Sequence, residues 1–132
     1  MTTRTASCRC GQWRAECTGE PFRIPVCHCL DCQQRSGSAF AVQTRFPADR
    51  VRMTGERREW VYVSESGNAM SFHFCPTCGS NLWYRAGPFP DAVAIPVGNF
   101  ADPNFPAPSF SVWEKRKHAW VEITGGAVEH YD

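Results

Sequence analysis

The chain of 132 residues carries 14 lysines and arginines against 13 acidic residues, a net charge of +1, and eight cysteines. Its length suits a single domain with a hydrophobic core over residues 1–132, and its nearly balanced charge argues against a dedicated nucleic-acid-binding protein. No stretch approaches the ~20 apolar residues of a membrane span, and the N-terminus lacks the apolar segment of a signal peptide, so we expect a cytoplasmic protein without membrane contact. In that reducing compartment, closely spaced cysteines favour metal binding over a disulfide framework.

The segment of residues 4–18 contains Cys8 and Cys10, then Gly11, which permits a bulge or tight bend, and then a period-2 pattern of Trp13, Ala15 and Cys17 that predicts a half-buried strand. Alternate residues of a strand point to the same side, so this spacing predicts that both sulfurs face one metal ion. Cys17, later in the same segment, has no cysteine nearby in the sequence. We interpret it as a small buried apolar residue.

An extended segment over residues 22–26 leads into three cysteines at C-x-C-x-x-C spacing, Cys27, Cys29 and Cys32. Sulfurs this close in sequence can converge on one metal ion. His28 points away from them in an extended segment, so we expect it either behind the ligands or facing solvent. Residues 30–35 predict one or two helical turns, ended by Ser36-Gly37-Ser38.

The remaining chain predicts short strands and no long amphipathic helix, and therefore an all-β fold of small sheets of short antiparallel strands. One hairpin surrounds the loop 64–68, and the next carries Cys75-Pro76-Thr77-Cys78-Gly79 at its tip. This motif predicts a zinc knuckle, in which backbone N–H groups point at sulfur and glycine accepts a positive φ. The predicted strands are 39–46, 51–53, 59–63, 69–74, 81–85, 91–97, 110–113 and 119–123.

The number of ligands that zinc requires favours one pairing of the clustered cysteines over the other. The knuckle supplies two ligands, and a structural zinc takes four. If Cys8 and Cys10 complete it, seven thiols form one closed site and one three-cysteine site. If two of the middle cysteines complete it, three thiols are left over. We favour the first pairing, in which metal binding also contributes to folding stability.

Three protein ligands with an open fourth position are typical of a catalytic zinc. Such an ion can polarise a carbonyl or bind a substrate thiol and lower its pKa, which prepares a thiolate for attack on a carbonyl compound. The alternative is a purely structural zinc whose fourth ligand is Cys17, His28 or a residue of a partner chain.

Four pieces of the chain together resemble the glutathione-dependent formaldehyde-activating enzyme (GFA) family, which includes the centromere protein V group. The resemblance covers roughly residues 8–120. Val112-Trp113 and Ala119-Trp120 also resemble the aromatic pattern near the end of the family's sequences. The four pieces are Cys8-Arg9-Cys10-Gly11, then Cys27-His28-Cys29-Leu30-Asp31-Cys32 with Gly37-Ser38, then Phe74-Cys75-Pro76-Thr77-Cys78-Gly79-Ser80, and Val97-Gly98-Asn99-Phe100-Ala101-Asp102-Pro103.

The resemblance implies a tent-like all-β fold that binds two zinc ions. It implies that the structural ion is held by Cys8, Cys10, Cys75 and Cys78, and that the catalytic ion, with its open position, is held by Cys27, Cys29 and Cys32. The implied activity is that of a carbon–sulfur lyase which condenses formaldehyde with glutathione to S-(hydroxymethyl)glutathione. The family's late G-T-L-D motif is altered here to Asn99-Phe100-Ala101-Asp102 after Gly98, so a related thiol is an alternative substrate.

Arg35, Gly37 and Ser38 are the candidate substrate-binding residues. The planar guanidinium of Arg35 suits a substrate carboxylate, and its alternative is an ordinary surface arginine. Phe40, Trp83 and Trp113 either line a pocket or belong to the core.

The leading hypothesis is thus a zinc-dependent lyase whose partners are a small-molecule thiol such as glutathione and a small aldehyde. Its alternatives are a non-catalytic glutathione-binding or small-molecule-binding module and a purely structural two-zinc domain. The sequence leaves the oligomeric state open.

Overall fold

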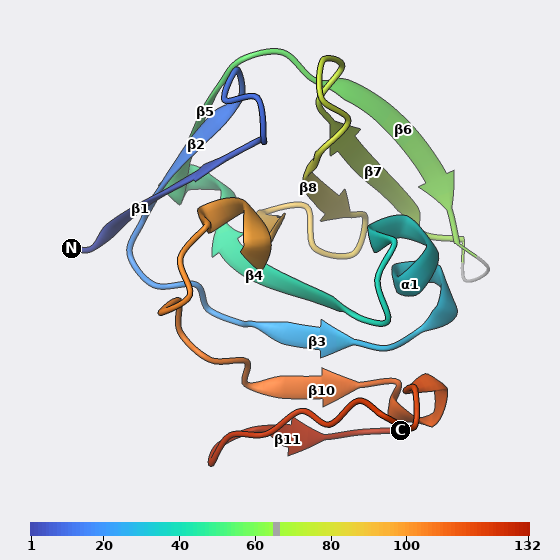
Figure 1. Cartoon of the computed structure of the whole chain (residues 1–132). Helices are drawn as coiled ribbons and strands as arrows, with labels where there is room; N and C mark the ends of the chain where they lie inside the picture. The colour runs from blue at the N-terminus through green and yellow to red at the C-terminus, as the bar shows by residue number, and fades with distance from the viewer. Residues whose placement is uncertain (65–66) are drawn as a thin grey trace.

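The computed structural model describes residues 1–64 and 67–132 as a three-stranded sheet, an eight-stranded sheet and one α-helix (Figure 1). The predicted all-β fold class is confirmed. Three short 3-10 turns, η1 (Ala48–Arg50), η2 (Val97–Phe100) and η3 (Glu114–Arg116), join strands. The helix is α1 (Leu30–Ser36), and the strands are β1 (Thr3–Ser7), β2 (Arg14–Thr18), β3 (Pro25–Cys27), β4 (Ala41–Pro47), β5 (Val51–Thr54), β6 (Arg58–Val63), β7 (Ala69–Phe74), β8 (Asn81–Ala86), β9 (Ala92–Pro96), β10 (Phe110–Val112) and β11 (Glu129–His130).

The small sheet has the strand order β1-β2-β5 and is antiparallel throughout. Its inward face alternates as the sequence predicts, since Trp13, Ala15 and Cys17 are all buried. Burial raises the pKa of the Cys17 thiol to about 12. Cys17 is therefore the buried core residue that its isolation in the sequence predicted.

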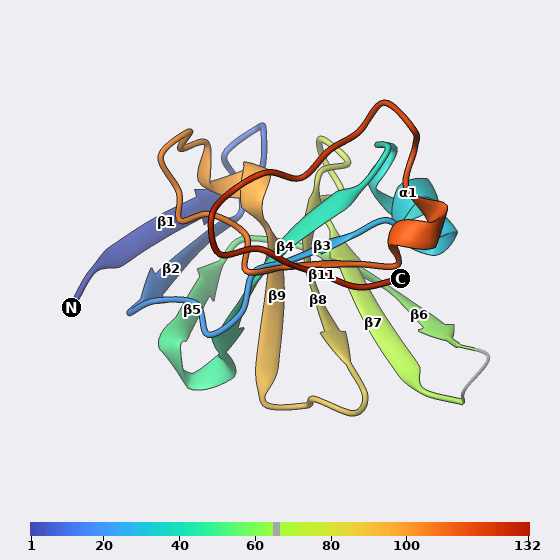
Figure 2. The ribbon, with the colours of Figure 1, turned by 90° about the horizontal axis from the view of Figure 1, so that it is seen from below.

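The large sheet has the order β11-β10-β3-β4-β9-β8-β7-β6. The two predicted hairpins are confirmed as the antiparallel pairs β6–β7 and β7–β8; residues 65 and 66 of the first hairpin's loop lie outside the described part of the chain. β10 instead pairs in parallel with both β3 and β11. Figure 1 shows β3, β10 and β11 side by side below β4, and Figure 2, seen from below, shows β6 to β9 projecting away from them.

Within residues 4–18 the chain turns after Ser7 and returns as β2 from Arg14, so the bend allowed at Gly11 is a full turn between two strands. One predicted strand is wrong. Residues 119–123 are not a strand: the Val121 N–H donates to the His118 carbonyl in a turn, and Lys117 Nζ caps the Val121 carbonyl at 2.7 Å. β10 instead takes the unpredicted β11 as its neighbour.

The core joins the two sheets and reaches the first metal-binding motif. Trp13, Phe46, Leu82 and Ile95 are almost completely buried within it. Cys8 and Cys75 belong to the same packed cluster, so the motif rests directly on the core. In the described part of the chain, no helix is long and apolar enough to cross a membrane.

Candidate metal centres and the adjoining cavities

Seven of the cysteines gather in two groups, and within each group all sulfurs lie within 4.8 Å of one another. One group unites Cys8 and Cys10 with Cys75 and Cys78, and the other consists of Cys27, Cys29 and Cys32. This is the pairing that ligand counting favoured. The geometry brings together residues that are more than sixty positions apart in the chain.

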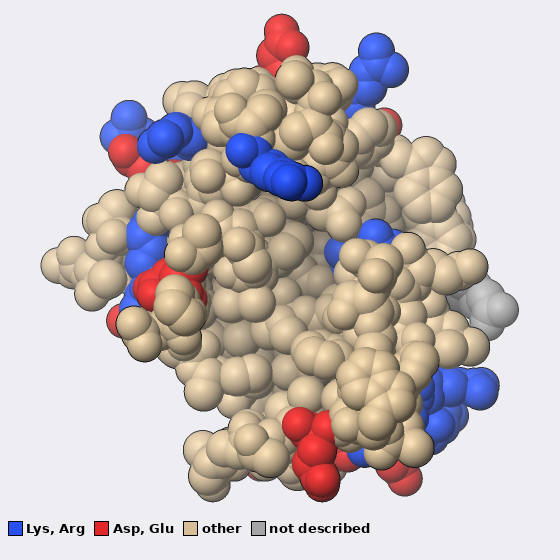
Figure 3. Space-filling model, viewed as in Figure 1, with Lys and Arg blue, Asp and Glu red and all other residues tan. Residues whose placement is uncertain are grey.

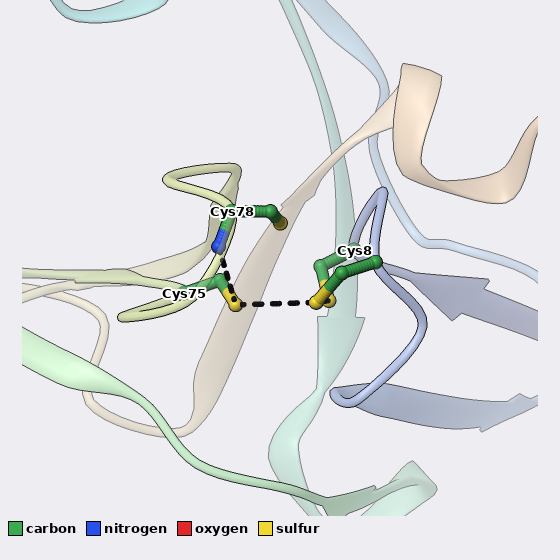
Figure 4. A group of neighbouring side chains, drawn as sticks. Cys8, Cys75 and Cys78 are labelled. Carbon is green, nitrogen blue, oxygen red and sulfur yellow. Dashed lines mark hydrogen bonds between the residues drawn. The ribbon is translucent and has the colours of Figure 1, made fainter.

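The four-cysteine group forms where two turns face each other (Figure 4). Cys8 comes from the turn between β1 and β2, and Cys75 and Cys78 come from the β7–β8 turn. Cys8 and Cys10 therefore converge through a turn, not through strand alternation. The Sγ atoms of Cys8 and Cys10 are 3.5 Å apart, and those of Cys10 and Cys75 are 3.8 Å apart. A tetrahedral zinc with Zn–S bonds of about 2.3 Å separates its sulfurs by about 3.8 Å, so this donor set fits zinc.

Backbone and side-chain donors surround these sulfurs. The N–H groups of Thr77 and Cys78 both lie 3.4 Å from Cys75 Sγ, as the knuckle motif predicted, and Gly79 has a φ of +76°. The Ser80 hydroxyl, 3.2 Å from Cys78 Sγ, and nearby backbone N–H groups lower the pKa of Cys78 to about 5. Such donors stabilise thiolates, which are the form that binds a metal.

Gln12 is a supporting residue that the sequence did not reveal. Its amide nitrogen donates to Cys75 Sγ at 3.1 Å and to the Glu56 carbonyl at 2.8 Å, while its amide oxygen accepts from the Glu56 N–H at 2.8 Å. It ties the first cysteine turn to the β5–β6 connection and to the knuckle. No spacing rule marks such a residue, because its partners are more than forty positions away.

Gly55, after β5, allows the β5–β6 connection to lie close to the backbone of Gln12 and Trp13. Its φ is +102°, and a Cβ at this position would lie 2.2 Å from the Gln12 carbonyl oxygen and 2.7 Å from the Trp13 Cα. We expect Gly55→Ala to lower the free energy of unfolding by about 2–3 kcal/mol, through strain and displacement of the first cysteine turn. Urea unfolding measures this, with Gly67→Ala as the control, since its φ is also positive but no atom of residues 1–64 or 67–132 lies within 4 Å of the added Cβ. Equal losses in the two variants would contradict this role.

The three-cysteine group is built on the start of α1. Cys27 ends β3, Cys29 is the N-cap residue of α1, and Cys32 lies in its first turn. The Cys32 N–H donates to Cys29 Sγ at 3.3 Å, so one thiol both caps the helix and faces the group. Hydrogen bonds from Cys27 and Cys29 and the positive charge of Arg35 lower the pKa of Cys32 to about 6.

No fourth cysteine, histidine or carboxylate joins this group among residues 1–64 and 67–132. Cys17 belongs to the core cluster that also includes Cys8 and Cys75. His28 is fully buried, with its Nε2 2.9 Å from the Ser111 hydroxyl, and burial lowers its pKa. The expectation that His28 faces solvent is therefore wrong, and it lies behind the ligands. Neither intrachain candidate for a fourth ligand is in place.

A cavity of about 440 Å³, here called the central cavity, is connected to the three-cysteine group through Arg35, which borders the cavity and whose Nη2 is 4.0 Å from Cys32 Sγ. Arg35, Ser38 and Phe40 border it, as does Asn99 from the altered late motif. Gly37 is not in the lining but ends α1 with a φ of +69°. Figure 3 shows a hollow near the centre of this face, with basic atoms at its edge on the side of α1.

Gln43 forms part of the floor of the central cavity and was not anticipated from the sequence. Its side chain is 2% exposed, and its Oε1 has no hydrogen-bond partner within the described chain. Gln43 lies two residues from Ala41, which pairs directly with Cys27 across β3 and β4. All three side chains therefore lie on one face of the sheet. A buried amide oxygen without a partner is an acceptor available to a ligand.

Arg35 lies between the three-cysteine group and the sheet. Its guanidinium stacks over the rings of Phe72 and Tyr84, at 5.5 and 5.1 Å, and its Nη2 is 4.0 Å from Cys32 Sγ. Of the other aromatic candidates, Trp83 is a core residue stacked on His73 at 3.8 Å, and Trp113 is 47% exposed. Neither borders the central cavity.

Comparison with known proteins agrees with these features. The model of the family described as glutathione-dependent formaldehyde-activating enzyme matches residues 3–116. A crystal structure of a Rhodobacter sphaeroides protein is similar in fold, with a TM-score of 0.58 and 18% identity over 76% of this chain and 90% of that chain. No curated protein matches the sequence. Because the family model covers most of the chain, including both cysteine groups, the chain belongs to the glutathione-dependent formaldehyde-activating enzyme family.

Proposed function

We propose that the chain is a zinc-dependent carbon–sulfur lyase that joins a thiol to a small aldehyde and cleaves the same bond in reverse. Glutathione and formaldehyde, giving S-(hydroxymethyl)glutathione, are the pair that family membership suggests. The observation that carries the proposal is the three-cysteine group itself, with three converging thiols and no fourth ligand in the described chain. Arg35, 4.0 Å from Cys32 Sγ, links this group to the central cavity that it borders. Three protein ligands are the donor set of a catalytic zinc, whereas four make a structural one.

The two groups would therefore differ in function. The four-cysteine group would hold a structural zinc, and the Cys27, Cys29 and Cys32 group would hold the catalytic one. Zinc bound there supplies a position for the substrate sulfur and stabilises its thiolate form at neutral pH.

The protein's own residues would hold the substrate in place. The guanidinium of Arg35 would bind a carboxylate of the thiol substrate, and Gln43 Oε1 would accept a hydrogen bond from an N–H or O–H of the bound molecule. In the reaction the thiol loses its proton, its sulfur bonds to the carbonyl carbon, the C=O π bond breaks and the oxygen takes up a proton. No electron donor or acceptor is needed.

If Arg35 binds a carboxylate, Arg35→Ala should raise the KM for glutathione about 10- to 100-fold, because a bidentate charge-assisted contact is lost. The KM for the neutral thiol 2-mercaptoethanol should change little. Arg35→Lys should recover only part of the loss, since lysine lacks the planar fork. Equal KM changes for both thiols would contradict this assignment.

The direct test of the proposed function is exchange spectroscopy by NMR on glutathione and formaldehyde with the zinc-loaded chain. We expect exchange into S-(hydroxymethyl)glutathione to exceed the buffer rate. No acceleration, combined with glutathione binding in calorimetry, would replace the lyase with a non-catalytic binding module.

A further inference from the structure

A second cavity, of about 400 Å³ and here called the aromatic cavity, shares Arg35 and Asn81 with the central cavity as lining residues. Trp60, Phe72 and Phe74 supply one wall, and Asp31 and Gln34 of α1 lie opposite with Arg35. Three aromatic rings with a few polar groups are typical of a site that binds a small organic ligand.

Trp60 and Phe72 belong to a row of aromatic side chains that crosses three strands and continues to Tyr84, which is not part of the cavity lining. Trp60 pairs with Phe72, and Phe72 pairs with Tyr84, so all three side chains share one face of the sheet. The Trp60 ring is inclined by 15° to the Tyr62 ring and by 28° to the Phe72 ring, at centroid distances of 5.5 and 6.2 Å. Trp60 is nevertheless 58% exposed. The ring therefore packs against its neighbours and still leaves part of its surface open to a ligand.

Arg35 connects this cavity to the three-cysteine group. It borders both cavities, and its Nη2 is 4.0 Å from Cys32 Sγ. Among the described residues no ion pair joins Arg35 to a carboxylate. A ligand held by Arg35 near the thiols can therefore extend its substituents into the central cavity or into the aromatic cavity.

Formaldehyde does not need the aromatic cavity. It has two heavy atoms and is little larger than a water molecule, whose share of liquid volume is about 30 Å³. A cavity roughly ten times larger, with a tryptophan ring as its outer wall, suits an aryl or branched alkyl group.

We propose that the aromatic cavity is a substrate subsite for an aryl or bulky alkyl group on the carbonyl component. The preferred reaction would then join a thiol R′SH to an aldehyde RCHO to give R′S–CH(OH)R, with R against Trp60 and Phe72. The sulfur–carbon bond forms, the C=O π bond breaks, the thiol proton is released and the carbonyl oxygen is protonated, so no oxidant or reductant is needed. This inference rests on the proposed function.

Two stable thioethers test the subsite without turnover. S-benzylglutathione carries an aryl group where the adduct carries R, and S-methylglutathione does not. Calorimetry on the zinc-loaded full chain should show about tenfold tighter binding of the benzyl compound, and Trp60→Ala should abolish that preference. Trp120→Ala is the matched control, because Trp120 is also exposed, at 75%, but does not border the aromatic cavity.

Equal affinities for the two thioethers, no binding of either, or a preference that survives Trp60→Ala would each overturn the subsite. These results are distinguishable from failure of the lyase itself. Accelerated formaldehyde exchange with equal thioether affinities keeps the lyase and rejects the subsite. A Trp60-dependent benzyl preference, with no exchange of glutathione with either formaldehyde or benzaldehyde, would keep an aryl-binding site at the aromatic cavity and reject the lyase.

Discussion

Cys29→Ser is expected to reduce thiol–aldehyde exchange at least about 100-fold, because one of three metal ligands is lost. It should leave the fold intact. Cys29 is the N-cap of α1, and its Sγ accepts the Cys32 N–H. Serine is among the preferred N-cap residues, so this substitution removes the thiolate but retains the cap.

Cys29→Ala provides the matched comparison, because it removes both the ligand and the cap. We expect it to be as inactive as Cys29→Ser and less stable by about 1 kcal/mol. Thermal unfolding followed by circular dichroism and exchange by NMR measure the two effects separately. If Cys29→Ser unfolds as readily as a variant of the four-cysteine group, the three-cysteine group is a structural site and the lyase proposal fails.

Cys78→Ser is expected to have the largest effect on stability, lowering Tm by at least about 10 °C or leaving the chain unfolded. Its group ties the β1–β2 turn to the β7–β8 turn, and its buried members Cys8 and Cys75 pack in the core. Losing one ligand of a closed site removes the metal binding that contributes to folding. Activity should fall only as far as the folded fraction falls.

Cys17→Ala is the control for removing a thiol that belongs to neither group. Cys17 is fully buried, so a moderate loss of about 1 kcal/mol is expected, with the zinc content unchanged. Cys78→Ser should bind one zinc ion fewer than the wild-type chain in elemental analysis. Retention of the full zinc content together with the wild-type Tm would show that Cys78 is not a ligand.

The cysteine pairing was predictable because it depends on ligand number. Of the two pairings compared, only one divides the seven clustered thiols into a closed four-cysteine set and a three-cysteine set without leaving any thiol over. The structure has that division. The knuckle geometry around Cys75 and Gly79 was predictable for a related reason, since a short turn leaves few places for its N–H groups. Helix α1 also begins and ends close to its predicted bounds.

What the sequence did not reveal depends on contacts between distant segments. Gln12 and Gln43 carry no motif, and their importance appears only when the β5–β6 connection and the floor of the central cavity are in place. The parallel pairing of β10 with β3 joins Phe110 to Pro25, and no local pattern specifies a partner so far away. The sequence predicted that His28 points away from its flanking cysteines. It did not reveal the partner of His28, which is the Ser111 hydroxyl of the distant strand β10.

The aromatic cavity was missed for the same reason. Trp60, Phe72 and Phe74 read as ordinary strand residues of a hairpin in the sequence. Their proximity to Arg35 requires α1 to lie over the same face of the sheet, and this is a tertiary feature.

X-ray absorption spectroscopy at the zinc edge, with and without glutathione, tests the central claim most directly. The chain with two zinc ions should show about 3.5 sulfur ligands per zinc, the average of a four-sulfur and a three-sulfur site, and the number should rise to about 4 when glutathione binds. In Cys29→Ser that rise should be absent. Four sulfurs per zinc before glutathione is added, with no change afterwards, would contradict an open position at Cys27, Cys29 and Cys32.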